Sequence, residues 1–122
     1  MDHSKEFLAL VDDAKARVNE ITIDELDARR ARGEALRLVD VREDDEWRAG
    51  HAAGAEHIGR GVLERDVVGR VPDKDCALVL YCGGGFRSAL AADNLQKMGY
   101  RRVWSLAGGW KEWLKRGRPT EK

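Results

Sequence analysis

The sequence predicts an α/β fold built on a small parallel sheet. The first observation is that short, continuous apolar runs at residues 36–41 and 77–81 are typical of strands buried on both faces. The second is that a glycine-rich turn at residues 82–88 joins the later run to an Ala/Leu-rich segment, which indicates a strand that passes directly into a helix. In open α/β sheets, ligands bind at such turns, beyond the carboxyl ends of the strands.

The length and charge of the chain limit its class. Its 122 residues suffice for one domain with a buried core, and 43% of them are hydrophobic. Because 22 Lys and Arg residues balance 22 Asp and Glu residues, bulk charge does not favour binding to nucleic acid or to an anionic membrane. No apolar run approaches the ~20 residues of a membrane span, and no signal-peptide core opens the chain, so we expect a cytoplasmic protein.

Two helices are expected before the first long strand. Residues 1–20 predict a helix that packs on the domain, since apolar residues recur near the helical period up to Val18 and Ser4 suits the N-cap. The second helix begins at a capping box formed by Thr22 and Glu25, and it ends near residue 32 because Gly33 follows.

The middle of the chain predicts two strands around a short helix. Residues 36–41 form the first strand, and the acidic turn at 42–46 opens a helix that ends near Ala49 because Gly50 follows. A shorter strand is expected at residues 55–58.

Three elements are expected after the glycine-rich turn: a helix at 88–97, a strand at 101–106, and a closing turn and helix at 107–116. Gly99 is placed as the C-cap of the first of these helices. The main domain is therefore expected over residues 21–116. Residues 117–122 are small, charged or Pro and are expected to form a flexible tail.

Cys76 and Cys82 are not expected to form a disulfide. They lie at opposite ends of one predicted strand, about 20 Å apart at about 3.3 Å per residue. A disulfide needs Cα atoms within about 7 Å. Free thiols fit a reducing compartment, and Cys76 is most simply a core residue, with a redox accessory role left open.

Cys82 is the candidate nucleophile. The three residues that follow it, Gly83, Gly84 and Gly85, have no Cβ and can adopt positive φ, so that backbone N–H groups can surround its sulfur. The N-terminus of the following helix and the guanidinium of Arg87 add positive charge, which should favour the thiolate over the thiol. The simpler alternative is a buried cysteine beside an ordinary glycine-rich turn.

The sequence around this cysteine resembles the active-site loop of the rhodanese-family sulfurtransferases. In that family a Cys, four residues, an Arg and then Ser or Thr surround a cysteine that becomes a persulfide, and Cys82 to Ser88 follow this order. An N-terminal signature of the family is also matched, at residues 38–42, Glu46-Trp47, Gly50-His51 and Gly54-Ala55. One departure is Gly59, where the family usually has Pro, which loosens that turn without implying loss of activity.

The resemblance implies a three-layer α/β/α rhodanese-like domain with an extra N-terminal helix, and a sulfurtransferase activity. Cys82 would attack the outer sulfur of a small donor, thiosulfate or a persulfide, carry it as a persulfide, and pass it to cyanide, a thiol or a thioredoxin-type acceptor. The N–H groups of the loop would stabilise the sulfur, Arg87 would orient a donor anion, and Ser88 would cap the helix. The loop comprises Gly83, Gly84, Gly85, Phe86, Arg87 and Ser88. No cofactor and no metal are implied, and both a monomer and a homodimer remain open.

Asp40 and Arg42 are candidate supporting residues. Asp40 ends the strand predicted to lie beside the strand of the nucleophile, so it can face the crevice or, more commonly, pair with an arginine or cap backbone N–H groups. Arg42 is expected to pair with Glu46 at i, i+4 spacing, with substrate contact as the alternative. His51 and His57 have no third ligand at zinc-like spacing, so no metal site is predicted.

Two other functions remain as alternatives. A cysteine phosphatase or arsenate reductase also uses an anion loop from Cys to Arg at a helix N-terminus, but these families place one residue more in that interval than the four between Cys82 and Arg87. The shorter ring fits one sulfur better than a tetrahedral phosphate. The second alternative is a sulfur-carrier or regulatory module that receives sulfur from a desulfurase or serves a partner protein.

Overall fold

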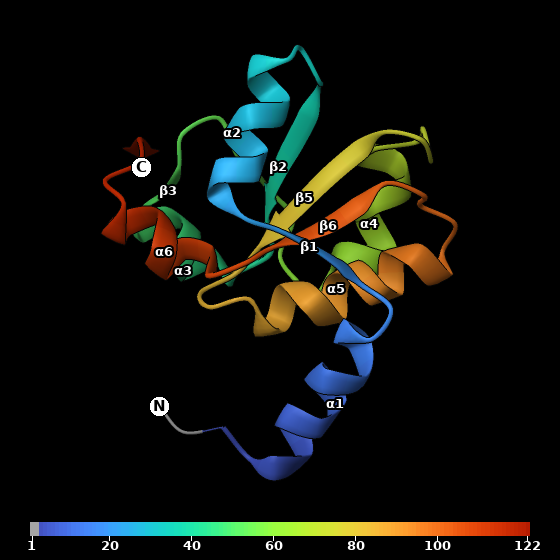
Figure 1. The fold of residues 1–122 in the computed structure, drawn as a ribbon. Coiled ribbons are helices and arrows are strands. Elements are labelled where there is room, and N and C mark those ends of the chain that lie inside the picture. The colour runs from blue at the N-terminus through green and yellow to red at the C-terminus, as the bar shows by residue number, and fades with distance from the viewer. Residues whose placement is uncertain (1–2) are drawn as a thin grey trace.

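A five-stranded parallel sheet forms the centre of the computed structural model, which describes residues 3–122 (Figure 1). Its strands, in spatial order, are β1 (Asn19–Ile21), β6 (Val103–Leu106), β5 (Ala77–Tyr81), β2 (Leu36–Asp40) and β4 (Glu56–His57). Every neighbouring pair is parallel. The strand that leads to Cys82, β5, therefore lies in the middle of the sheet, with all five of its residues buried.

Helices cover both faces of this sheet: α2 (Ile23–Ala31), α3 (Asp44–Ala49), α4 (Leu63–Arg70), α5 (Phe86–Lys97) and α6 (Gly109–Lys115). Side chains of β2 and β5 alternate between two cores because successive residues of a strand point to opposite faces. Val39 and Leu80 join α4 and α5 in one core, whereas Leu38 and Val79 join α2 and α6 in the other. The three-layer α/β/α prediction is confirmed. Among the described residues, no helix is both long and apolar enough to cross a membrane.

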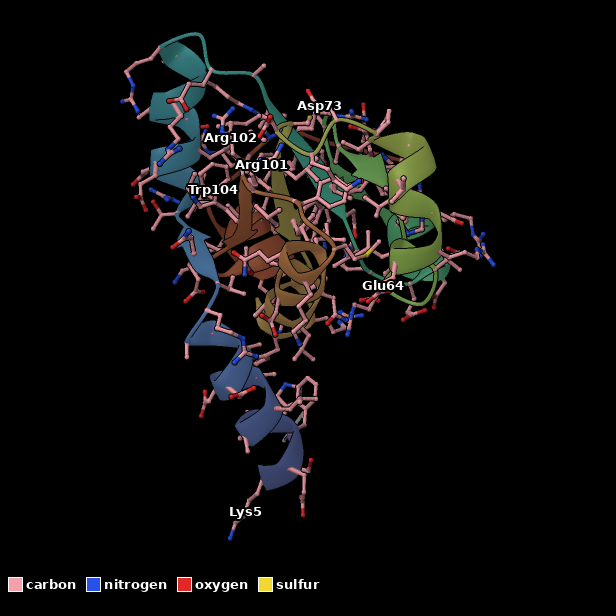
Figure 2. All side chains as sticks on the ribbon, turned by 90° about the vertical axis from the view of Figure 1, so that its right-hand side faces the viewer. Lys5, Glu64, Asp73, Arg101, Arg102 and Trp104 are labelled. Atoms are coloured by element: carbon pink, nitrogen blue, oxygen red, sulfur yellow. The ribbon has the colours of Figure 1, made fainter. Side chains whose placement is uncertain are left out.

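The first helix, α1 (Lys5–Lys15), packs outside these layers against α5 and projects beyond the body of the domain (Figure 1). Ser4 caps it by accepting a hydrogen bond from the Phe7 backbone at 3.0 Å. Figure 2 shows Lys5 at the end of α1 that points away from the domain, whereas Arg101 and Asp73 lie at the opposite end of the molecule. The helix ends at Lys15 rather than near Val18, but its expected packing against the domain is present.

Local signals located most helix ends. The capping box of α2 is formed as expected, with reciprocal hydrogen bonds of 3.0 and 3.1 Å between Thr22 and Glu25. By contrast, α4 was not predicted. Its residues include four charged side chains and Gly69 in the last turn, and its N-cap Val62 provides no side-chain hydrogen bond, so the sequence carries neither a clear apolar period nor a start signal.

The C-terminal segment does not end in the frayed conformation expected from its composition. Residues Thr120–Glu121 form β7, which pairs antiparallel with β3 (His51–Ala52). The Trp113 indole also donates a hydrogen bond of 2.8 Å to the carbonyl of Pro119. The C-terminal segment thus contacts β3 and α6, and the local sequence of residues 117–122 did not reveal these contacts.

Candidate active site

Cys82 lies directly after β5, at the carboxyl edge of the sheet, and its side chain is almost completely buried, with 1% exposed. It lines a pocket of about 290 Å³. The loop residues Gly83, Gly84, Phe86 and Arg87 line this pocket, together with four residues from other parts of the chain, His3, Phe7, Glu46 and Lys111. The predicted nucleophile is thus placed where a ligand can reach it.

Backbone N–H groups are directed at the sulfur. Gly85 donates to Cys82 Sγ at 3.1 Å and Ser88 donates at 3.4 Å. Gly85 is the N-cap of α5 and has φ of +102°, which a residue with a Cβ adopts only with strain; Gly83 and Gly84 do not have positive φ, although all three were expected to be free to adopt it. The sulfur therefore sits at the positive end of α5, where negative charge is stabilised.

A pair of buried hydroxyl groups lies behind the sulfur. Ser88 Oγ is 3.5 Å from Cys82 Sγ and 2.8 Å from Ser105 Oγ on β6, and both serines are completely buried. When Ser105 donates to Ser88, the Ser88 hydroxyl can donate to the sulfur, as a thiolate requires. The expectation that Ser88 caps α5 is wrong, because Gly85 is the N-cap and no side chain caps this helix.

Ser105→Ala is expected to slow alkylation of Cys82 by iodoacetamide at a fixed pH roughly two- to tenfold, the value of one hydrogen bond of about 0.5–1.5 kcal/mol. The reason is that Ser88 is then no longer oriented toward the sulfur. Ser105→Thr keeps the hydroxyl and should restore the rate. An unchanged rate in Ser105→Ala would assign Ser105 to packing alone.

The N-terminus of α6 holds the active-site loop from the other side. The backbone N–H of Trp110 donates to the Cys82 carbonyl at 2.7 Å, and the backbone N–H of Lys111 donates to the Gly83 carbonyl at 3.0 Å. This close approach requires glycine at position 109, since a Cβ there would lie 2.4 Å from the Cys82 carbonyl oxygen. With these carbonyls bound to α6, the following N–H groups of the loop are left to face the sulfur.

Arg87 does not present a free guanidinium to the pocket. It forms two hydrogen bonds with the Glu46 carboxylate, at 2.8 and 3.2 Å. This contact holds the pKa of Glu46 below its usual range and raises that of Arg87. The expected pairing of Glu46 with Arg42 is wrong, because the fold brings Glu46 to Arg87 instead.

Asp40 and Arg42 lie behind the site rather than in the pocket. Asp40 is completely buried and accepts hydrogen bonds from the Arg42 backbone at 2.8 Å and from its guanidinium at 2.8–3.1 Å. Arg42 also donates to the Gly50 carbonyl at 2.7 Å and stacks on Trp110 at 4.7 Å. The pair joins the ends of β2, α3 and α6, which is the structural alternative considered for Asp40.

His51 and His57 both stack on Trp47, with ring centroids 3.3 and 5.0 Å from the indole. Each also bonds a backbone carbonyl, that of Trp47 or Arg42. Within residues 3–122, no group of three or more His, Cys, Asp or Glu side chains is arranged to hold a metal ion.

Several residues of the site carry no local signal. Ser105 is one small polar residue in an otherwise apolar strand, and only its alignment with β5 places it behind Cys82. His3 and Phe7 precede the domain in sequence, and Lys111 lies within it on α6, 29 residues after Cys82. The Gly108-Gly109 pair was a visible signal, since two glycines before a helix indicate an unusual turn or a close backbone approach.

Comparison with known proteins identifies similar chains. A segment of 76 residues is 38% identical to the uncharacterised protein YqhL of Bacillus subtilis and covers 62% of this chain and 59% of YqhL. The thiosulfate sulfurtransferase GlpE of Coxiella burnetii is 32% identical over 76 residues, which cover 62% of this chain and 69% of GlpE.

Solved structures share the fold. A protein of unknown function from Rhodopseudomonas palustris, described as a possible tyrosine phosphatase, has a TM-score of 0.82 at 31% identity, over 99% of this chain and 98% of its own. The polysulfide-sulfur transferase homodimer of Wolinella succinogenes has a TM-score of 0.79 at 28% identity, over 95% and 87%. Residues 22–116 match the family model of the Rhodanese-like domain. This chain therefore belongs to the rhodanese-like family.

Proposed function

We propose that the protein is a sulfurtransferase in which Cys82 carries a sulfane sulfur from a donor such as thiosulfate to a thiol, cyanide or a thioredoxin-type acceptor. The observation that supports it best is the convergence of the Gly85 and Ser88 N–H groups on the sulfur of Cys82, which lines a pocket. These donors suit a sulfur that is an anion both before and after it is loaded.

The transfer takes place in two displacements. The Cys82 thiolate attacks the outer sulfur of thiosulfate, the new S–S bond forms, and sulfite leaves with the electron pair of the broken bond. The acceptor, as cyanide or a thiolate, then attacks the terminal sulfur, and the Cys82 thiolate is the leaving group. No electron is gained or lost overall, so no cofactor or metal is part of this proposal.

The sulfur-carrier alternative uses the same persulfide. The protein YrkF of Bacillus subtilis, which is described as a putative sulfur carrier protein, is 31% identical to this chain over 80 residues. The match covers 66% of this chain and 42% of YrkF. A carrier would be loaded slowly by thiosulfate and quickly by a partner such as a desulfurase. Comparing these two loading rates separates a carrier from an enzyme that acts on small molecules.

The phosphatase alternative is tested by the length of the loop. Inserting one Gly between Gly85 and Phe86 is expected to reduce thiosulfate turnover about 100-fold, because it displaces the N–H groups that surround the sulfur. Thiosulfate turnover and aryl-phosphate hydrolysis are measured side by side on both proteins. A wild-type protein that hydrolyses the phosphate efficiently and ignores thiosulfate would overturn the proposal in favour of a phosphatase.

We further propose a reducing, cytoplasmic location, which is supported by the free thiols of Cys76 and Cys82. A monomer and a homodimer are both compatible with the proposed reaction. Analytical ultracentrifugation distinguishes them.

A further inference from the structure

We propose that the Cys82 pocket is built for organic sulfur compounds: thiols or persulfides that combine an apolar, aromatic-sized body with a carboxylate. The apolar body would contact His3, Phe7 and Phe86, which we call the aromatic wall, and the carboxylate would bind Lys111. This inference rests on the proposed sulfur transfer and names the substrate class of that site.

The aromatic wall is a contiguous group of rings beside the nucleophile. The His3 ring lies 4.8 Å from the Phe86 ring and 5.1 Å from the Phe7 ring, and the two Phe rings meet edge to face at 6.2 Å. All three residues line the same pocket as Cys82. Exposed ring surface at this place favours an apolar group on the bound molecule.

The wall is held in position by the packing of α1 on α5. Val11 and Ala14 are buried against Ala89 and Leu90, and Phe7 and Phe86 pack against this cluster. At the other end of the contact, Arg17 forms hydrogen bonds of 2.9 and 2.7 Å with Asp93, whose side chain is 7% exposed. Because α5 begins at the active-site loop, α1 and the nucleophile are parts of one packed unit.

Two of the three wall residues lie outside the family match, which begins at residue 22. His3 and Phe7 therefore add a surface to the pocket that the rhodanese-like domain alone does not provide. This is the reason to connect them with the choice of substrate rather than with sulfur transfer itself.

The charges of the pocket favour a singly charged organic ligand over a small dianion. The charge of Arg87 is compensated by its two hydrogen bonds with Glu46. Lys111 is exposed and forms no ion pair within residues 3–122, so it is the cation available to a ligand carboxylate. Thiosulfate would fill little of the 290 Å³ and would gain nothing from the rings.

The test separates loading from unloading. Cys82 is first loaded with sulfur from thiosulfate or inorganic polysulfide, and the added sulfur is verified by mass spectrometry. Single-turnover unloading rates are then measured with cyanide, 2-mercaptoethanol, benzyl mercaptan and 4-(mercaptomethyl)benzoate, compared at equal thiolate concentration. For the wild type we expect the two aromatic thiols to react faster than 2-mercaptoethanol, and the carboxylated one to react fastest.

Three variants assign the effect. Phe7→Ala should slow both aromatic thiols about fivefold relative to cyanide. Lys111→Gln should slow 4-(mercaptomethyl)benzoate about threefold relative to benzyl mercaptan, which lacks the carboxylate. Leu10→Ala, at an exposed position of α1 outside this pocket, is the matched control and should change no rate. If circular dichroism shows that Phe7→Ala does not fold, Phe7→Leu replaces it, with a smaller loss of the same sign.

Equal wild-type rates for all three thiols, or a Phe7 variant that slows every acceptor alike, would overturn this inference and leave the proposed function intact. Failure of every donor to load sulfur onto Cys82 would instead overturn the proposed function, and this inference with it.

Discussion

Cys82→Ser is expected to eliminate sulfur loading and turnover while leaving the fold close to that of the wild type. A hydroxyl fits the same space and can accept hydrogen bonds from the same N–H groups, but oxygen cannot form a persulfide. The measurements are the protein mass after incubation with thiosulfate, the rate of thiocyanate formation with cyanide, and the thermal unfolding midpoint. Substantial turnover by this variant would show that the sulfur is carried elsewhere.

The matched control is Cys76→Ser, which changes the second free cysteine. This residue precedes β5, at the end of the strand opposite to Cys82, and it contacts the core rather than the pocket. We expect the variant to retain most of its turnover. If it folded normally but lost activity, Cys76 would have a redox partnership with the nucleophile.

Gly109→Ala is expected to lower both stability and activity. The new Cβ would lie 2.4 Å from the Cys82 carbonyl oxygen, so α6 and the loop must move apart, at a cost of roughly 1–3 kcal/mol. The residue also has φ of +52°, which costs an alanine about 1–2 kcal/mol more. Because the loop shifts, its N–H groups no longer point at the sulfur, and turnover should fall about 10- to 100-fold.

Gly117→Ala provides the control for backbone strain. Gly117 also has positive φ, +64°, but a Cβ there would meet nothing within 4 Å. It should therefore cost about 1 kcal/mol of stability and leave turnover unchanged. Thermal unfolding and thiocyanate formation are measured on both variants. Equal losses in the two variants would show that the close approach at position 109 does not matter for the site.

The sequence was sufficient for features that depend on local chemistry. The apolar runs that became β2 and β5 can only be buried between two layers, and the order of residues from Cys82 to Ser88 carried the family resemblance. The capping box at Thr22 starts α2 and the glycine after α3 ends that helix, and each does so through residues that are close to it in the chain. For these features the partners are neighbours in the chain, so the pattern alone predicted them.

Tertiary structure alone decided which distant groups meet at the sulfur. Glu46 could pair with either of two arginines: Arg42, at helical spacing, or Arg87, far along the chain. The fold brings Glu46 to Arg87, whereas Arg42 pairs with Asp40. Ser105 reaches the site only because β6 lies beside β5, and Phe7 only because α1 packs on α5. Such contacts depend on strand order and helix docking, which arise from burial of the whole core and not from the residues that meet.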